Sequence, residues 1–334
     1  MSKNILGFVL IDAPHSALNN DKADAGARTE NMVVVKVIRK GSSVYPYVSA
    51  QAWRYWWRMA LQDKFNWNLS PIIREAKVAF TSANPFEYPD DDVFGYMRAV
   101  KKADGGTLTR LSPLKCSPLV SICKHAPTDD FGVMSRHEGD PVPFEHQFYS
   151  TVLKGIFSLD LKSVGSFCDN ARTGFKNLDE KCVETSEIKA AIQRTGAAKQ
   201  SGAWQIPKAE RIKRAKDAIS ALPYLYSTTK AAGHLTDVTP KFIILAVMDG
   251  GNHIFMNVTN ESYDKPVNIS ALKQVLADYS SNIVSDIYIG RQDGFMDELD
   301  KDLKGLTVAG KTMHCHSPKQ AVEKFVEVIK DHIQ

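Results

Sequence analysis

Short hydrophobic runs rich in β-branched residues alternate along this chain with stretches of helical periodicity. The runs predict strands, because Val and Ile favour a pleated, buried backbone. The predicted strands cover residues 5–11, 32–38, 76–80, 119–122, 148–159, 242–248, 253–258 and 283–289. Helical spacing predicts helices over residues 50–64, 271–279 and 295–303, and a last helix opened by Ser317-Pro318. Strands mixed with helices in this way indicate an α+β protein.

The predicted helix at 50–64 has two different faces. Ser49 precedes it as a candidate N-cap residue. At about 100° per residue, one face combines three polar side chains: Gln51, Arg54 and Arg58. The apolar stripe roughly opposite consists of Trp53, Trp56, Trp57 and Leu61. We interpret the indoles as core-facing and the polar row as donors for phosphates or 2′-hydroxyls.

Positive charge is concentrated around this helix. Residues 28–58 contain six cations against one acid, Glu30. The six cations are Arg28, Lys36, Arg39, Lys40, Arg54 and Arg58. They would come from a polar loop, a strand, a turn and the helix, and we expect them to converge on one groove. This distribution favours a polyanionic partner; a solvated cationic face over an ordinary core helix is the alternative.

The charge of the whole chain is uneven. Its 334 residues have a formal charge of +4 and are 43% apolar, which is enough for a large core. Residues 1–248 contain 33 Lys and Arg against 25 Asp and Glu, whereas residues 249–334 contain nine against thirteen. The basic surface therefore belongs to the first three quarters of the chain.

Cysteine usage and apolar run lengths bear on the compartment. The five cysteines are odd in number and form no Cys-x-x-Cys pair, which indicates reduced thiols. The longest core-like run, 242–248, is far too short to span a membrane, and the run at 5–11 stops at Asp12 without a cleavage pattern. We expect a soluble, cytoplasmic protein with no membrane partner.

Two long segments lack the strand pattern. Residues 123–143 are rich in Gly, Pro, Asp and His and predict a long loop, which is usually functional or disordered. Residues 185–222 are basic and predict an amphipathic helix that begins after Pro207, with a cationic outer face. That face lines a nucleic acid or is merely solvated; the sequence does not decide between them. Its predicted buried stripe is Ile212, Ala215, Ile219 and Leu222.

Four stretches of the chain form long and unusual words: NILGFVLIDAPHSALNN, RTENMVVVKVIRKG, YPYVSAQAWRYWWR and LPYLYSTTKAAGHLTDVTPKFIILAVMDGG. They resemble the DevR family, the backbone subunits of type I-B CRISPR Cascade complexes. The loop motif of related backbone families corresponds here to Asn19-Asn20-Asp21, their Gly-Gly turn to Lys40-Gly41, and their helix start to Ser49-Ala50-Gln51. The loop lacks the usual Arg, and Ala50 replaces a Ser.

The resemblance implies an RRM-like (ferredoxin-like) palm with inserted fingers and a projecting thumb hairpin, all within one domain over residues 1–334. The finger-like insertion would be residues 81–110, the thumb 123–143 and the basic helical insertion 185–222. No strand has the aromatic signature of base-stacking RRM domains, so backbone gripping is favoured.

The function implied is a non-catalytic subunit that assembles head-to-tail along a CRISPR guide RNA (crRNA). Its partners would be the crRNA, a target DNA strand, further copies of itself and other Cascade subunits, without cofactor or metal. Candidate RNA contacts are Arg28, Lys36, Arg39, Lys40, Ser49, Gln51, Arg54, Arg58, Lys115 and Lys230. Candidate thumb residues, which would kink the RNA and contact the neighbour, are Lys124, His125, Met134, Arg136 and His137. Possible DNA contacts are Lys101, Lys102 and Arg110.

Two alternatives remain, a metal-dependent endoribonuclease on the same fold and a free-standing RNA-binding protein. The first rests on the acids and the His of the first loop, since carboxylates beside a nucleic acid can hold Mg²⁺. They are Asp12, His15, Asp21 and Asp24. His314-Cys315-His316 also suggests a metal site, but adjacent residues of an extended chain point to opposite sides, so a strand or loop end is favoured.

Overall fold

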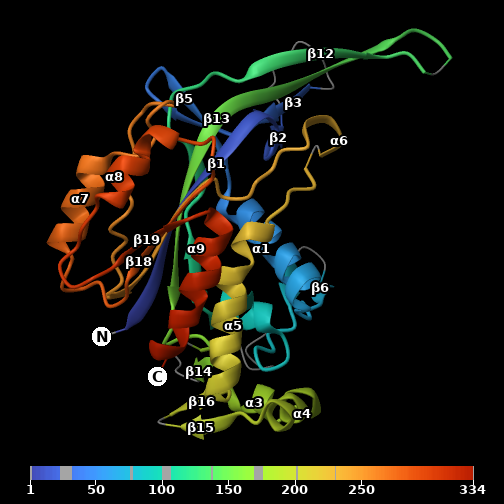
Figure 1. Ribbon diagram of the computed structural model, residues 1–334. Helices are drawn as coiled ribbons and strands as arrows, with labels where there is room; N and C mark the ends of the chain where they lie inside the picture. Colours follow the sequence, from blue (N-terminus) through green and yellow to red (C-terminus); the bar gives the residue numbers. More distant parts are fainter. Residues whose placement is uncertain are drawn as a thin grey trace.

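A computed structural model describes residues 2–22, 32–75, 78–99, 107–136, 138–168, 176–200, 202–229 and 231–333. The largest sheet has the strand order β19-β18-β17-β1-β13-β11-β5-β4, with β10, β12 and β3 also paired to β13 and β2 to β3 (Figure 1). Its strands are β1 (Lys3–Ser16), β2 (Asn20–Lys22), β3 (Met32–Val35), β4 (Val37–Lys40), β5 (Ser43–Val48), β10 (Leu114–Cys116), β11 (Leu119–Ser121), β12 (Thr128–Met134), β13 (Val142–Asp160), β17 (Phe242–Asp249), β18 (Ile287–Arg291) and β19 (Met313–His316). The predicted mixed α+β class is confirmed.

Helices and smaller sheets complete the described chain. The α-helices are α1 (Ala50–Phe65), α2 (Pro89–Phe94), α3 (Glu180–Val183), α4 (Ser186–Thr195), α5 (Lys208–Ser220), α6 (Ala231–His234), α7 (Ile269–Asp278), α8 (Asp300–Lys304) and α9 (Pro318–Phe325). The 3₁₀ turns are η2 (Leu222–Tyr224), η3 (Asp297–Leu299) and η4 (Val326–Asp331). The smaller sheets are formed by β6 (Ile72–Glu75) with β7 (Val78–Thr81), β8 (Tyr96–Arg98) with β9 (Leu108–Arg110), and β14 (Ser166–Cys168), β15 (Ala198–Gln200) and β16 (Ala203–Gln205). No helix of the described residues is both long and apolar enough to cross a bilayer.

The central strands β1 and β17 are buried on both sides, which explains their unbroken apolar sequences. Successive residues of β1 enter different cores because strand side chains alternate between faces. Val9 belongs to the core under α1, α5 and α9, whereas Phe8 belongs to the core under α7 and α8. Gly7 is needed here, since a Cβ atom at this position would lie 2.0 Å from the Phe157 ring of β13.

Helix α1 packs its indole stripe onto β13. The Trp57 and Phe157 ring centroids are 5.1 Å apart, edge to face, and Trp57 Nε1 donates to the Ala218 carbonyl oxygen of α5 at 2.6 Å. Trp53, Trp56 and Trp57 are all buried. The predicted helix and its core-facing stripe are therefore confirmed.

The two predicted insertions meet in a separate small core. Phe86, from the segment before α2, stacks edge to face on Phe167 of β14 at 4.9 Å, beside Ile188 of α4. Figure 1 places β14, β15, β16, α3 and α4 together at the end of the molecule away from β12. Parts of the two predicted insertions, around Phe86 and around α4, therefore pack together, whereas α5 belongs to the main core.

A long hairpin projects from the opposite end. Strand β12 pairs along its whole length with the first part of β13, from Thr128 opposite Phe148 to Met134 opposite Val142. β13 then continues into the main sheet, where Leu159 lies opposite Ile5 (Figure 1). We call residues 128–148 the projecting hairpin. The prediction of an irregular loop over 123–143 is wrong for residues 128–134 and 142–143, because these are held by a regular antiparallel ladder.

Two further strand predictions need correction. Residues 253–258 form a turn and not a strand. The predicted strand 32–38 is divided at Lys36 into β3, which pairs with β13, and β4, which pairs with β5. The last helix begins as predicted, with Ser317 Oγ accepting from Gln320 N at 3.4 Å.

Candidate nucleic-acid interface

The start of α1 is an electropositive helix end. Ser49 Oγ accepts from Ala52 N at 3.3 Å, as predicted for an N-cap residue, and the first turn contains no acidic side chain. Gln51 is exposed beside the cap. Unpaired N–H groups and the helix dipole favour an anion at such an end.

The first loop is joined to this helix end by Asn19. Asn19 Oδ1 accepts from the Ser49 backbone N–H at 2.8 Å, and the Asn19 carbonyl oxygen accepts from Lys36 N at 2.9 Å. Lys36 is half-buried at the break between β3 and β4. The loop, Lys36 and the helix start are therefore brought together, although they are up to 30 residues apart in sequence.

Arg54 is occupied by the protein itself. Its guanidinium donates to the carbonyl oxygens of Phe94 at 2.5 Å and Leu114 at 2.6 Å, and to Ser112 Oγ at 3.2 Å. These bonds connect α1 to the ends of α2 and β10. Arg54 could contact a phosphate only through guanidinium N–H groups that these hydrogen bonds do not use.

Arg58, one turn later, lies over an aromatic ring. Its guanidinium carbon is 4.2 Å from the Phe94 ring centroid, and Nε is 3.9 Å from Asp90 Oδ2. Burial, and then the charge of Arg54, lower the pKa of Arg58 to about 10. A pKa of about 10 leaves the side chain charged at neutral pH. Since 27% of its surface is exposed, it also reaches solvent.

Arg39 and Lys40 lie at the far end of the β4–β5 hairpin. Lys40 is opposite Ser43, and its ammonium is 5.0 Å from the Tyr45 ring centroid; both cations are exposed. Strand β5 then runs six residues to Ser49, roughly 20 Å at 3.3 Å per residue. Among the described residues, the predicted cations thus lie along a path and do not converge on one groove. Lys115 of β10 is also exposed.

Arg110 is a correction to the predicted DNA contacts. It is 4% exposed, and it forms an ion pair with Asp92, which is itself fully buried. Arg214 of α5 takes the other carboxylate oxygen, Nη1 to Oδ2 at 2.9 Å. Because Arg110 cannot reach a nucleic acid without unfolding this cluster, we remove it from the candidate contacts.

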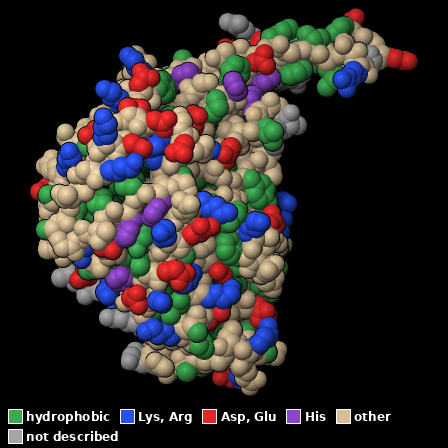
Figure 2. Space-filling view, viewed as in Figure 1, with side chains coloured by type: hydrophobic (Ala, Val, Ile, Leu, Met, Phe, Trp, Pro, Cys, Tyr) green, Lys and Arg blue, Asp and Glu red, His purple; other side chains and the backbone are tan. Residues whose placement is uncertain are grey.

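The same cluster corrects the predicted cationic outer face of α5. Arg211 and Arg214 are buried, and Arg211 donates to the carbonyl oxygens of Val164, Leu161 and Lys162. The predicted stripe residues Ala215, Ile219 and Leu222 are buried, as expected. In Figure 2, which shows the side that contains α5 and α9, Lys and Arg alternate with Asp and Glu and no single-sign patch appears.

The projecting hairpin contains apolar side chains in solvent. Phe131 is 61% exposed and Val133 49%, and both lie on the same face of the ladder, opposite Glu145 and Pro143. Met134, at the end of β12, is 53% exposed, and Figure 2 shows the hydrophobic row along this arm. The sequence analysis did not predict Phe131 and Val133 as thumb residues. Their spacing of two in residues 129–133, Asp-Asp-Phe-Gly-Val, is the pattern of a strand and could have indicated them.

The other predicted thumb residues divide between tip and base. Arg136 is exposed in the turn, and Lys124 is exposed before β12. His125 is fixed at the base, where its N–H donates to the Val44 carbonyl oxygen at 2.8 Å and Nε2 accepts from Ser150 N at 3.3 Å. Burial lowers the pKa of His125 and so disfavours its charged form.

Five of the predicted contacts lie outside the described residues. They are Arg28, Lys101, Lys102, His137 and Lys230. Asp24 of the first loop lies outside them too.

Asp12 and Asp21, the described acids of the first loop, are not part of a cluster that could hold a metal ion. Within the described part of the chain, no three or more His, Cys, Asp or Glu side chains are placed to hold a metal ion. Asp12 is half-buried, and burial raises its pKa against the opposing charge of Lys241. His314, Cys315 and His316 lie on β19, as the strand interpretation predicts.

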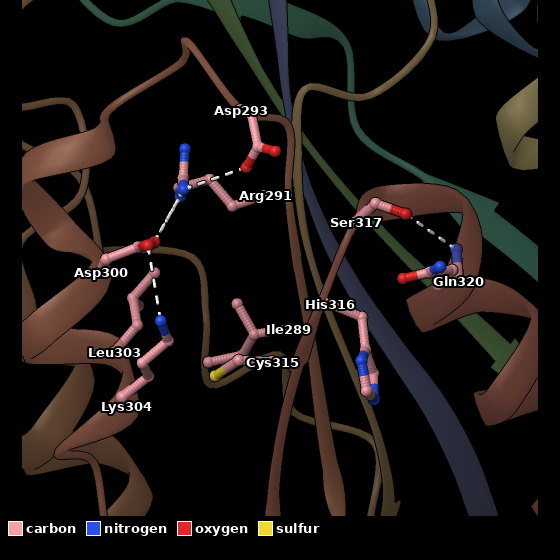
Figure 3. A pocket seen from close by; sticks show the side chains of 10 residues that line it. All are labelled: Ile289, Arg291, Asp293, Asp300, Leu303, Lys304, Cys315, His316, Ser317 and Gln320. Atoms are coloured by element: carbon pink, nitrogen blue, oxygen red, sulfur yellow. Dashed lines mark hydrogen bonds and ion pairs between the residues drawn. The ribbon is translucent and has the colours of Figure 1, made fainter.

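A pocket of about 370 Å³ opens beside β19, between α8 and the start of α9 (Figure 3). Its one buried cation, Arg291, is surrounded by the carboxylates of Asp293, Asp297 and Asp300. The cation is therefore neutralised internally, and Figure 3 shows it turned toward Asp293 and Asp300 and not toward Lys304. We do not include this pocket in the interface.

The fold and this surface define a class: a mixed α+β protein with one large mixed sheet, a basic path along one sheet end and a projecting hairpin. A solved chain titled "CRISPR RNA-guided surveillance complex" has the same fold, with a TM-score of 0.54 at 10% identity over 97% of this chain and 99% of that one. A second, titled "CRISPR RNA-guided surveillance complex, pre-nicking", has a TM-score of 0.57 at 12% identity over 98% and 100%. No curated protein sequence matches.

The family is shown by sequence. Residues 14–266 match the family model described as "CRISPR-associated negative auto-regulator DevR/Csa2". The matched segment covers most of the chain and includes the first loop, α1 and the projecting hairpin. The chain belongs to the DevR/Csa2 family.

Proposed function

We propose that this protein is a non-catalytic backbone subunit of a CRISPR RNA-guided surveillance complex, and that it binds guide RNA along the path from Arg39 and Lys40 to the start of α1. The observation that carries the proposal is the DevR/Csa2 match across this path. The fold shared with two chains from such complexes supports it. The main sheet acts as a palm, segment 81–110 as part of the fingers and the projecting hairpin as the thumb, in a complex of type I-B.

The contacts are those of a backbone-gripping protein. Arg39, Lys40, Lys36 and Arg58 supply positive charge to phosphates, and the start of α1 supplies N–H groups and Gln51. Such contacts position a strand without reading its sequence. Sequence recognition is left to base pairing between guide and target DNA. Copies associate head-to-tail, a geometry that produces a filament and not a closed ring.

The test is the salt dependence of RNA binding by Arg39→Ala with Lys40→Ala. Each lost phosphate contact should lower the log–log slope of affinity against salt by about 0.7. Both side chains are exposed, so the fold should be unchanged by circular dichroism. The matched control is Lys301→Ala with Lys304→Ala, an exposed pair of α8 in the acidic last quarter, which should keep the wild-type slope. If the slope falls for Lys301→Ala with Lys304→Ala and not for Arg39→Ala with Lys40→Ala, the RNA does not bind along the proposed path.

Arg54→Ala is not a clean test of the RNA contact. Its loss would remove a donor from the carbonyl oxygens of Phe94 and Leu114, of which the second keeps Ser112 Oγ, so weaker RNA binding could come from a displaced α2 and β10. Lys115→Ala, on the exposed side of β10, is the cleaner probe of the same region.

The protein should leave RNA uncut. Labelled guide and complementary RNA are incubated with Mg²⁺ or Mn²⁺, and the wild type is compared with Asp12→Ala and Asp21→Ala by gel electrophoresis. We expect identical intact bands in all lanes. Regularly spaced cuts that disappear in one of the two variants would instead support the endoribonuclease alternative.

A further inference from the structure

A pocket of about 280 Å³ opens at the end of β13 that lies away from the projecting hairpin, where Asn4 of β1 is opposite Asp160. The side chains that line it include Lys3, Lys162, Ser166, Gln205, Arg211 and His332. Each of these can donate a hydrogen bond, and three of them are cations. Among the described residues, no carboxylate lines this pocket. The composition of its wall therefore favours an anion.

The two lysines of this pocket lack a counter-charge within the part of the chain that the structure describes. Neither Lys3 nor Lys162 forms an ion pair there with a carboxylate. Lys216 of the neighbouring helix α5, in contrast, has its ammonium 2.9 Å from Glu327 Oε2. An anion between the two ammonium groups would offset their mutual repulsion.

His332 adds an uncharged donor beside Lys3. Lys3 Nζ is 3.5 Å from His332 Nδ1, and an ammonium can only donate, so Nδ1 accepts and the ring proton is on Nε2. Burial, and then the charge of Lys3, lower the pKa of His332 against the opposing charge of Asp331. The neutral ring is therefore favoured, and it lines the pocket as an N–H donor.

The turn that contains Lys162 is held in place by its neighbours. Arg211, 5% exposed, donates to the Lys162 carbonyl oxygen at 3.1 Å. Asp160 Oδ1 accepts from Lys162 N at 3.0 Å and from Ser2 Oγ at 2.6 Å, and Oδ2 accepts from Ser163 Oγ at 2.7 Å. The backbone of Lys162 is thus fixed while its side chain is exposed, which reduces the entropy lost when its ammonium binds a ligand.

The pocket continues into a second one of about 420 Å³. The two share Ser2, Lys162 and Ser166, and the second extends to Lys115 of β10. Lys115 is exposed. An extended anion that passes Lys115 could therefore reach the first pocket, as could a small free anion from solvent.

We propose that Lys3, Lys162 and His332 bind one phosphate group, with Ser166 and Gln205 as neutral donors. Phosphate is favoured over carboxylate, because a carboxylate is matched by the planar fork of an Arg, whereas lysine binds phosphate as a point charge. The phosphate belongs either to a nucleic-acid strand that passes Lys115 or to a free nucleotide or inorganic phosphate. The site does not use Arg39, Lys40 or the start of α1, so this proposal and the guide path can fail independently.

The test is thermal unfolding of the RNA-free protein in chloride buffer at constant ionic strength, with inorganic phosphate and adenosine monophosphate titrated separately. A ligand that binds only the folded protein raises Tm with the logarithm of its concentration above Kd. Phosphate also stabilises proteins in general as an excluded salt, and that effect is the same in all variants. We therefore compare each titration with variants of the pocket.

Lys162→Gln removes one charge from an exposed side chain, so the fold should be unchanged. The loss of one charged hydrogen bond should weaken phosphate binding about 10- to 100-fold. Lys162→Arg keeps the charge and should retain most of the affinity. Lys273→Gln, at an exposed lysine of α7 outside both pockets, is the matched control and should behave as the wild type does.

A short single-stranded RNA identifies the source of the phosphate. If a strand occupies the pocket, Lys162→Gln should lower the log–log slope of RNA affinity against salt by about 0.7. If the ligand is a free phosphate or nucleotide, RNA binding should be unchanged, and Lys162→Gln should alter only the titrations with phosphate or adenosine monophosphate.

Two results would overturn the proposal. If Lys162→Gln matches the wild type with inorganic phosphate, adenosine monophosphate and RNA alike, the pocket binds no phosphate group. If none of these three distinguishes the variant but a polyglutamate peptide raises the Tm of the wild type more than that of Lys162→Gln, the pocket binds an acidic protein segment instead.

Discussion

Asp92→Ala should destabilise the protein by about 3–5 kcal/mol, the usual cost of removing one partner from a buried ion pair. The carboxylate is fully buried and joins Arg110 of β9 to Arg214 of α5, and it also accepts from Gly165 N at 3.0 Å. Without it, two guanidiniums remain in the core without a counter-charge at that point. Urea unfolding followed by tryptophan fluorescence measures the loss.

Asp92→Asn and Asp293→Ala make the result specific. The amide of Asn keeps one acceptor for the guanidiniums, so Asp92→Asn should lose less than Asp92→Ala. Asp293, which pairs with Arg291 from a fully exposed position, should leave the urea midpoint unchanged. If Asp92→Ala unfolds at the wild-type urea concentration, the cluster does not hold α2, β9 and α5 together.

The elements that the sequence predicts well are those in which local and tertiary signals agree. Ser49 begins α1, and the spacing of Trp53 and Trp57 fixes its buried face, so both the helix and its orientation could be predicted. The run in β17 is apolar because both of its faces are covered, and no polar position interrupts the pattern.

The wrong predictions concern side chains whose hydrogen-bond or ion-pair partners are distant in sequence. Nothing near Arg54 in the sequence shows that its acceptors are carbonyl oxygens 40 and 60 residues away. Arg211 and Arg214 read as surface cations because Arg is rarely buried, yet Asp92 and the carbonyl oxygens of the 161–164 turn satisfy them. The same cluster took Arg110 out of the predicted DNA contacts. Whether a charged side chain is buried depends on the partners available to it as much as on the residue itself.

The resemblance implied a hairpin at residues 123–143, but the residue pattern alone predicted a loop there, for a related reason. Its Gly, Pro and Asp content is typical of a loop, but β13 continues from the core into the hairpin and supplies a paired template for β12. Gly132 belongs to this ladder, since a Cβ atom there would lie 2.3 Å from the Phe144 ring. Gly132, which is typical of a loop, is required here because only glycine leaves room for the Phe144 ring.

Replacing residues 131–143 with a short Gly/Ser turn should abolish cooperative assembly on a long guide RNA and spare the monomer. The segment contains the exposed Phe131 and Val133, which make no core contact, and its removal leaves the His125 base and the β3–β13 pairing in place. Coupling between neighbouring sites is typically about 1–3 kcal/mol, or 5- to 150-fold in affinity. Exposed apolar patches of this kind mark interaction surfaces.

The measurement compares a short RNA, which binds one subunit, with a long one, which binds several. On the short RNA the deletion variant should bind as the wild type does, because Arg39, Lys40 and the start of α1 are retained. On the long RNA its binding curve should lose its steepness, and nuclease footprinting should lose the regular pattern of evenly spaced subunits.

A point variant separates the apolar face from hairpin length. Phe131→Ser with Val133→Ser keeps the ladder, since both side chains are exposed, and should lose most of the cooperativity that the deletion loses. Asp129→Ser, on the same face of β12 but polar, is the matched control and should assemble normally. If the deletion variant fills long RNA with wild-type steepness and footprint, the hairpin is not the contact between neighbours, and the exposed β6–β7 hairpin, where Ile72 is 68% exposed, becomes the next surface to test.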